Sequence, residues 1–273
     1  MRIPGPEHQE DGGLSAVAAA GGLHRYQLRL HEAYGPVVRF QLPGAETAVS
    51  VADPVLLEAT AHLDTRPEAL FAFLDPLCEA GNLQVLPADE HTPWRRLLLS
   101  VLAGRPAHER HFARLTELAR ELADRWAVAA ELDQVLGGRA TPDFGDLRRL
   151  TYLDMVLKES MRLFPPGPYG AREATEDLVL GPYEIPAGTT VFYPFWAVHL
   201  NPEHWPEPER FDPERFTPQE VTKRPRLAYV PFGIGPRSCE GAALATVEAQ
   251  LVLAVLLKRL RFRPAPGHGT GSG

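Results

Sequence analysis

The sequence predicts a mainly α-helical fold with small β-sheets, an α+β class. After Gly241, apolar side chains recur at helical spacing with no proline before Pro264, which predicts a long helix. Two short apolar runs, 37–42 and 48–51, flank a turn-forming stretch and predict a β-hairpin. Frequent prolines in 165–231 indicate ordered but irregular coil.

The amino-terminal part predicts a helix, the hairpin and a second helix. Residues 24–34 predict the first helix, which Gly35-Pro36 ends. The second helix is expected to run to His62, with Asp53 as N-cap and Pro54 at its first position.

The middle of the chain is expected to be helical. Residues 106–130 predict a long helix, and another helix follows Asp146 and ends at the prolines after Phe164. In that helix Glu159 and Arg162 are spaced i,i+3, so they lie on one face and can form an ion pair. The same spacing is common in exposed surface pairs, which contribute little stability.

The next stretch, 178–198, reads as short strands punctuated by glycine and proline. His199 and His204 follow it, and their spacing does not fit a pair of metal ligands. We therefore expect both histidines to serve in turns and packing.

One loop carries the strongest chemical signal. Gly233 and Gly235 let the backbone turn tightly and approach a flat ligand, while Pro231 and Pro236 stiffen the loop. Cys239 comes just before the long carboxy-terminal helix, where unpaired N–H groups and the helix dipole favour a thiolate. A thiolate in a rigid, mostly apolar loop suits a haem iron, whereas a buried structural cysteine is the alternative.

The full pattern resembles the cysteine-loop signature of the cytochromes P450. It reads Phe232-x-x-Gly235-x-Arg237-x-Cys239-x-Gly241-x-x-x-Ala245-x-x-Glu248. The resemblance implies that haem b is the cofactor and that Cys239 ligates its iron. It also implies that Phe232 shields the sulfur, that Arg237 reaches a haem propionate, and that Gly235 and Gly241 shape the loop at the haem.

The resemblance implies further haem contacts outside the loop. Trp94 and Arg95 resemble an aromatic and a basic residue that a helix of the family sends to the propionates, and His91 with Arg95 fits an alternative register. The match is partial, because Leu98 stands where a second basic residue is often found, and an ordinary amphipathic helix is the alternative. Arg172 resembles a further propionate ligand.

A second resemblance concerns structural charges. Glu159-x-x-Arg162, with the later Phe-Asp-Pro-Glu-Arg-Phe run at 211–216, resembles the buried Glu–Arg–Arg network of the family. Arg215 is then its third member. Its expected role is structural, because a planar guanidinium can bridge two partners.

The resemblance also implies an internal deletion near 126–131. Residues 129–138 resemble a segment beyond the long central helix of the family, while 118–126 resemble a much earlier helix. On the order of 150 residues, about one domain's worth, are then missing. We expect a single P450-like domain over 14–265 without the distal helices, and flexible tails at 1–13 and 266–273. Beyond the haem ligand we expect no catalytic residue, because the acid–threonine pair of the family is not found.

Composition limits the partners and the compartment. The chain has 273 residues and a net charge of −7, so nucleic acid is not an expected partner. Two cysteines give no disulfide framework, which suits a reducing cytoplasm. Cys78 is expected to be a small core residue. The glycine-broken run 14–23 is too short to span a bilayer and no secretory signal precedes it, so a cytoplasmic protein without membrane contact is expected.

The resemblance implies a haem-thiolate oxidoreductase, a P450 monooxygenase that acts on a small molecule of unknown identity. The alternative is a non-catalytic or peroxide-dependent haem-binding protein whose open distal face self-associates or meets a protein partner. Basic residues near the carboxy terminus form either a solvated face or a docking patch for a ferredoxin or flavin reductase. They are Lys223, Arg224, Arg226, Arg237, Lys258, Arg259, Arg261 and Arg263.

Overall fold

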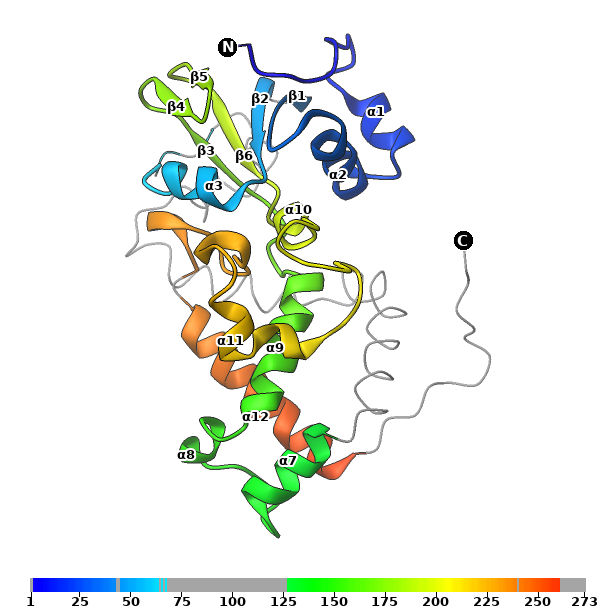
Figure 1. The fold of residues 1–273 in the computed structure, drawn as a ribbon, viewed down its shortest axis with the longest axis vertical. Coiled ribbons are helices and arrows are strands. Elements are labelled where there is room, and N and C mark those ends of the chain that lie inside the picture. Colours follow the sequence, from blue (N-terminus) through cyan, green and yellow to red (C-terminus); the bar gives the residue numbers. More distant parts are fainter. Residues whose placement is uncertain are drawn as a thin grey trace, which may run out of the picture. The chain divides into compact units, whose positions relative to one another are not determined.

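The computed structural model describes residues 2–42, 45–63, 65, 67, 127–239 and 241–260. The chain forms two compact units, whose elements are labelled in Figure 1. Unit 1 comprises 1–89, 160–210 and 218–240, and unit 2 comprises 90–159, 211–217 and 241–273. The mixture of helices and small sheets confirms the predicted α+β class.

Unit 1 contains a four-stranded sheet in the order β1-β2-β6-β3, made of β1 (Val37–Leu42), β2 (Ala45–Val51), β6 (Thr190–Tyr193) and β3 (Gly170–Glu173). β1 and β2 form the predicted hairpin, with Val37 opposite Val51. β2 and β6 are parallel, whereas β3 and β6 are antiparallel. A separate two-stranded sheet pairs β4 (Leu178–Leu180) with β5 (Tyr183–Ile185).

Alternation along the strands divides the apolar residues of unit 1 between two cores. Val37 of β1 joins a core with Leu57, Val198 and Ile234, whereas Val38 joins another with residues of the amino-terminal helices. Successive side chains of a strand point to opposite faces, so one sheet serves both cores. The first core also contains Val230, so the residues on both sides of the segment 231–233, Val230 and Ile234, are buried.

Unit 1 also contains several short helices. They include α1 (Leu14–Ala19), α2 (Leu23–Tyr34), α3 (Pro54–Thr60), α10 (Phe195–His199) and α11 (Pro218–Val221). The predicted start of α3 is confirmed, because the Asp53 carboxylate accepts hydrogen bonds of 2.9 Å from the N–H groups of Val55 and Leu56. α3 ends at Thr60, two residues before the predicted end.

The amino-terminal segment of unit 1 lies along β1. The Arg39 N–H donates to Pro4 O at 2.7 Å, and the Gln9 N–H donates to the Gln41 side chain at 2.7 Å. A Cβ at Gly5 would lie 2.0 Å from Arg39 O, so this contact requires glycine. The expectation of a flexible tail over 1–13 does not anticipate these hydrogen bonds.

Unit 2 contains α7 (Ala127–Leu136), α8 (Phe144–Leu147), the 3₁₀ helix η2 (Pro213–Phe216) and α12 (Ala242–Arg259). The division between the units falls within α9 (Thr151–Leu163), the predicted helix before the prolines. Glu131 of α7 caps α9 by accepting from Tyr152 N at 2.7 Å and Leu153 N at 3.0 Å. Of the predicted helix 106–130, the described residues contain only the part from Ala127 onward.

The predicted long helix after Gly241 is confirmed as α12. Its apolar residues at helical spacing do not form its buried side; they are Ala242, Ala245, Ala249, Val252, Leu253, Leu256 and Leu260. Gln250 and Ala254 are instead the buried positions, whereas Val252 is 53% exposed. Apolar residues occur all round this helix, so their spacing did not select one face. Gln250 hydrogen-bonds Asp154 of α9 at 3.0 Å, and this polar contact helps to fix the side that packs.

The described helices were also compared with the length and hydropathy that a membrane span requires. Within the described part of the chain, no helix has both.

Candidate functional site

The cysteine loop of unit 1 is held by its own backbone hydrogen bonds. The Cys239 N–H donates to Phe232 O at 2.7 Å, and the Gly233 N–H donates to Val230 O at 3.2 Å. Gly233 and Gly235 have φ of +77° and +66°, the left-handed region that favours glycine. The loop therefore presents a half-buried, unbridged Cys239 from a fixed backbone.

Gly235 makes a close approach within the protein. A Cβ there would lie 1.9 Å from Ala61 O, so no larger residue fits against the end of α3. The sequence predicted an approach to a flat ligand, and its loop signature contains no sign of this distant partner. Gly235 thus has a packing role in addition to its left-handed backbone conformation.

Three other predicted site residues lie in or beside this loop. Phe232 is half-buried, and Arg237 is exposed in the 3₁₀ helix η4 (Gly235–Arg237). Gly241 belongs to unit 2, where it is the N-cap of α12. The structure therefore brings Phe232, Arg237 and Cys239 together within a single loop of unit 1.

Arg172 lies on β3 of unit 1 and is 6% exposed. Its Nη1 donates to Ala171 O at 2.7 Å, and its Cζ lies 6.0 Å from the centre of the Tyr193 ring. Burial raises the pKa of Tyr193 to about 12, although a side-chain hydrogen bond with Thr60 and the Arg172 charge act in the opposite direction. The phenol beside Arg172 is therefore neutral.

Phe195 packs against both β3 and the cysteine loop. A Cβ added at Gly170 would lie 3.0 Å from the Phe195 ring, and one at Gly233 would lie 3.9 Å from it. In unit 1 the Phe195 ring therefore packs against both the strand that contains Arg172 and the loop that contains Cys239.

Arg162, at the end of α9 that belongs to unit 1, is fully buried. Its Nη1 donates to His199 O at 2.9 Å and to Pro208 O at 2.7 Å, and its Nη2 donates to Arg210 O at 3.2 Å. Its Cζ lies 5.0 Å from the centre of the Trp205 ring. The planar guanidinium therefore fixes several carbonyls of the coil that follows α10.

His199 connects α9 to the start of the cysteine loop. Its Nδ1 donates to Arg162 O at 3.1 Å, and its Nε2 accepts from the Val230 N–H at 2.8 Å. One nitrogen must donate and the other accept, which requires a neutral ring. Burial lowers the pKa of His199 to about 3. Its predicted packing role is confirmed, but nothing in the sequence indicated that it holds the residue next to Pro231.

Glu159 and Arg215 lie together in unit 2. Glu159 is fully buried, its Oε1 accepts from the Asp212 N–H at 2.8 Å, and the same oxygen lies 3.5 Å from Arg215 Nε. Arg215 is 9% exposed. The burial of Glu159 and Arg162 excludes the alternative of an exposed surface pair for either residue. The three residues of the predicted network are thus all buried.

Several residues of the predicted basic group form ion pairs with acidic side chains. In unit 1 Arg226 pairs with Glu58 and Lys223 with Glu220, and in unit 2 Lys258 pairs with Asp133. Arg224 lies 4.1 Å from the centre of the Trp205 ring. These pairs neutralise part of the charge on which docking would depend, which favours the solvated-face interpretation. Arg261 and Arg263 lie outside the described residues.

His91, Trp94, Arg95 and Cys78 also lie outside the described residues. Their predicted roles therefore stay predictions.

The cysteine-loop residues fit a haem with one protein thiolate ligand. Cys239 is half-buried on a backbone fixed at Phe232, and Arg237 in the same loop is a cation that can meet a propionate. This donor set is what a proximal haem site requires.

Comparison with known proteins identifies the family of this chain. The family described as Cytochrome P450 matches residues 111–271, more than half of the chain. Cyclooctat-9-en-7-ol 5-monooxygenase of Streptomyces melanosporofaciens is 44% identical over 140 residues, which are 51% of this chain and 30% of that protein. Thromboxane-A synthase of Mus musculus is 42% identical over 137 residues, which are 50% of this chain and 26% of that protein. The matched segments span about a quarter to a third of the length of these relatives. Because the family model covers more than half of the chain, the chain belongs to the cytochrome P450 family, whose members bind haem.

Proposed function

We propose that this chain binds haem b through the Cys239 thiolate and supplies the proximal half of a P450-type monooxygenase site. The observation that carries the proposal is the geometry of the cysteine loop. Its left-handed glycines and the hydrogen bond from Cys239 N–H to Phe232 O fix the backbone of the half-buried Cys239. A fixed, partly shielded sulfur is suited to stay bound as a thiolate.

The other loop residues have separate roles in this proposal. Phe232 limits water at the sulfur, and Arg237 pairs with a haem propionate. Arg172 on β3 is a candidate for the second propionate after its guanidinium turns from Ala171 O. A haem with a thiolate ligand supplies the oxygen-activating redox chemistry of the family. The protein contributes binding, orientation and the exclusion of water.

A network in unit 1 positions this loop. His199 holds the Val230 N–H, and Arg162 holds His199 O, so α9 supports the residue that precedes Pro231. In unit 2 the Glu159–Arg215 pair fixes the chain at Asp212. We propose that these residues are structural and do not contact the substrate.

Donor-driven monooxygenation also requires a substrate, an electron donor and a covered distal face. We propose a small-molecule substrate and a ferredoxin or flavin reductase as donor. The sequence contains no copy of the acid–threonine motif that delivers protons in the family. A haem-binding protein that is non-catalytic or uses peroxide is therefore the second candidate, with self-association or a protein partner covering the distal face.

Turnover experiments separate the two candidates. The haem-loaded chain is given a small-molecule panel with either a ferredoxin–reductase pair or hydrogen peroxide. Product formation from the reductase pair, coupled to reductant consumption, supports the monooxygenase. Product from peroxide alone supports the second candidate, as does haem binding without product. Failure to bind haem contradicts both.

A further inference from the structure

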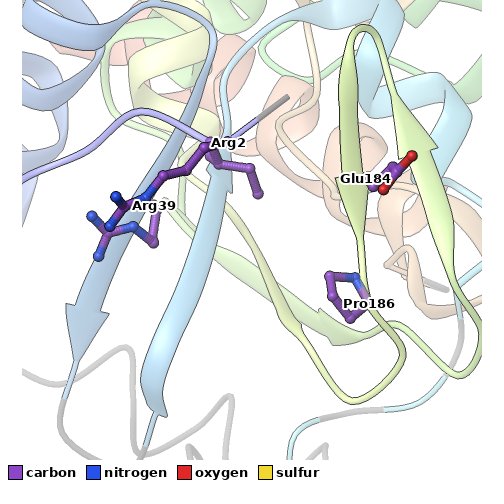
Figure 2. A pocket seen from close by; sticks show the side chains of 5 residues that line it. Arg2, Arg39, Glu184 and Pro186 are labelled. Atoms are coloured by element: carbon purple, nitrogen blue, oxygen red, sulfur yellow. The ribbon is translucent and has the colours of Figure 1, made fainter.

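A pocket of unit 1 lies outside the proposed haem site. Arg2, Ile3, Arg39, Glu184 and Pro186 line a volume of about 520 Å³, and Figure 2 shows four of them labelled. The amino-terminal segment and β1 supply the arginines, while β5 and the residue that follows it supply Glu184 and Pro186. No residue of the cysteine loop belongs to this lining.

The Arg39 guanidinium is held in place by one hydrogen bond, but its Nε–H group has no acceptor within the described part of the chain. Its Nη2 donates to Pro6 O at 3.1 Å, and the backbone of Arg39 is bonded to Pro4. Its Nε is buried and has no hydrogen-bond acceptor among the described residues. A buried N–H without an acceptor is costly, so a small shift of the side chain that brings this N–H to a ligand oxygen in the pocket is favourable.

A second guanidinium lies on the same wall. In Figure 2 the Arg2 and Arg39 side chains extend to one side of the pocket, and Glu184 and Pro186 stand across it. Two positive charges on one wall repel each other unless an anion lies between them. Guanidinium groups bind phosphate oxygens through paired hydrogen bonds, and two of them match the charge of a phosphate ester.

The opposite wall has the complementary charge. Glu184 is exposed and forms no ion pair with any other described residue. Ile3 and Pro186 add apolar surface that suits a short carbon chain. We propose that this pocket binds a small zwitterion of the phosphoethanolamine type, with its phosphate at Arg2 and Arg39 and its ammonium at Glu184. The source is either a free phosphoamine or the headgroup of a phospholipid.

Calorimetry on the haem-loaded chain tests this proposal, with phosphoethanolamine and inorganic phosphate as probes. Phosphoethanolamine binds more tightly than phosphate, and Arg39→Gln weakens it about tenfold to hundredfold because a charge-assisted contact is lost. Glu184→Gln abolishes the preference for phosphoethanolamine while phosphate binding remains. Arg29→Gln, at an exposed position of α2, is the matched control and changes neither.

Flotation with phosphatidylethanolamine vesicles separates the two sources. Binding of soluble phosphoethanolamine identifies a free ligand, whereas binding to vesicles alone, with the same loss in Arg39→Gln, identifies a headgroup. Glu184 is exposed, so its variant keeps the fold and remains informative if Arg39→Gln unfolds. Equal binding of both soluble probes, binding unchanged in Glu184→Gln, or no binding to either probe or to vesicles would overturn the proposal.

Discussion

Arg162 and His199 hydrogen-bond each other in both directions within unit 1. Arg162 Nη1 donates to His199 O at 2.9 Å, and His199 Nδ1 donates to Arg162 O at 3.1 Å. Both residues are fully buried. The remaining ring nitrogen of His199 accepts from Val230 N–H, immediately before Pro231. The cysteine loop therefore begins from a backbone position that a neutral histidine holds.

This arrangement predicts a loss of stability in acid. Burial lowers the pKa of His199 to about 3, and the Arg162 charge acts in the same direction. Below the unfolded-state pKa of about 6.5 the unfolded chain binds the proton that the folded chain excludes. This group should then lower the free energy of unfolding by about 1.4 kcal/mol per pH unit.

Urea unfolding at pH 7 and pH 5 measures this effect. His199→Gln removes the titrating group and should show a shallower pH dependence than the unaltered chain. His62→Gln, at an exposed position, serves as the control and should keep the original slope. Identical slopes in all three proteins would show that His199 does not control acid stability.

The Arg162 contacts predict a large stability cost on removal. Arg162→Leu leaves the carbonyls of His199, Pro208 and Arg210 without this donor, at about 3–5 kcal/mol in total. Arg210→Leu removes an exposed ion pair with Glu207 and should cost less than about 1 kcal/mol. Thermal unfolding compares the two variants. Similar small losses would mean that the Arg162 side chain is not essential to unit 1.

Glu159 provides a corresponding test in unit 2. Glu159→Ala removes a buried anionic partner of Arg215 and the acceptor of Asp212 N–H, so it should cost about 3–5 kcal/mol. Glu220→Ala breaks an exposed pair with Lys223 and should have little effect. The yield of folded, haem-containing protein is the readout. Normal yield from Glu159→Ala would contradict the structural role of this pair.

Alanine substitutions at two glycines distinguish the stability cost of backbone strain from that of steric overlap. Gly188 has φ of +80° and open space around its Cβ position, so Gly188→Ala should cost only about 1–2 kcal/mol. Gly235→Ala adds overlap with Ala61 O and should cost more, with loss of haem as the loop shifts. Unfolding midpoints and haem content compare them. Equal effects in the two variants would show that the Ala61 contact is unimportant.

Local features of the fold were predictable because short-range chemistry determines them. Asp53-Pro54 marks the start of α3, and the glycine and proline pattern marks the cysteine loop. Contacts between distant residues were not predictable. Gly235 meets Ala61, and His199 meets Val230, through packing that no spacing in the sequence encodes. The buried side of α12 was not predictable either, because apolar side chains surround this helix and the contact of Gln250 with Asp154 is not visible in periodicity.

The carbon monoxide difference spectrum of the reduced protein tests the central claim most directly, because it reports thiolate ligation of haem iron. The unaltered chain should give the thiolate-type spectrum, and Cys78→Ala should keep it. Cys239→Ala should lose that spectrum, because the proposed ligand is gone, while an unchanged unfolding midpoint would show that its fold persists. A thiolate-type spectrum that survives in Cys239→Ala would contradict the assignment of Cys239 as the haem ligand.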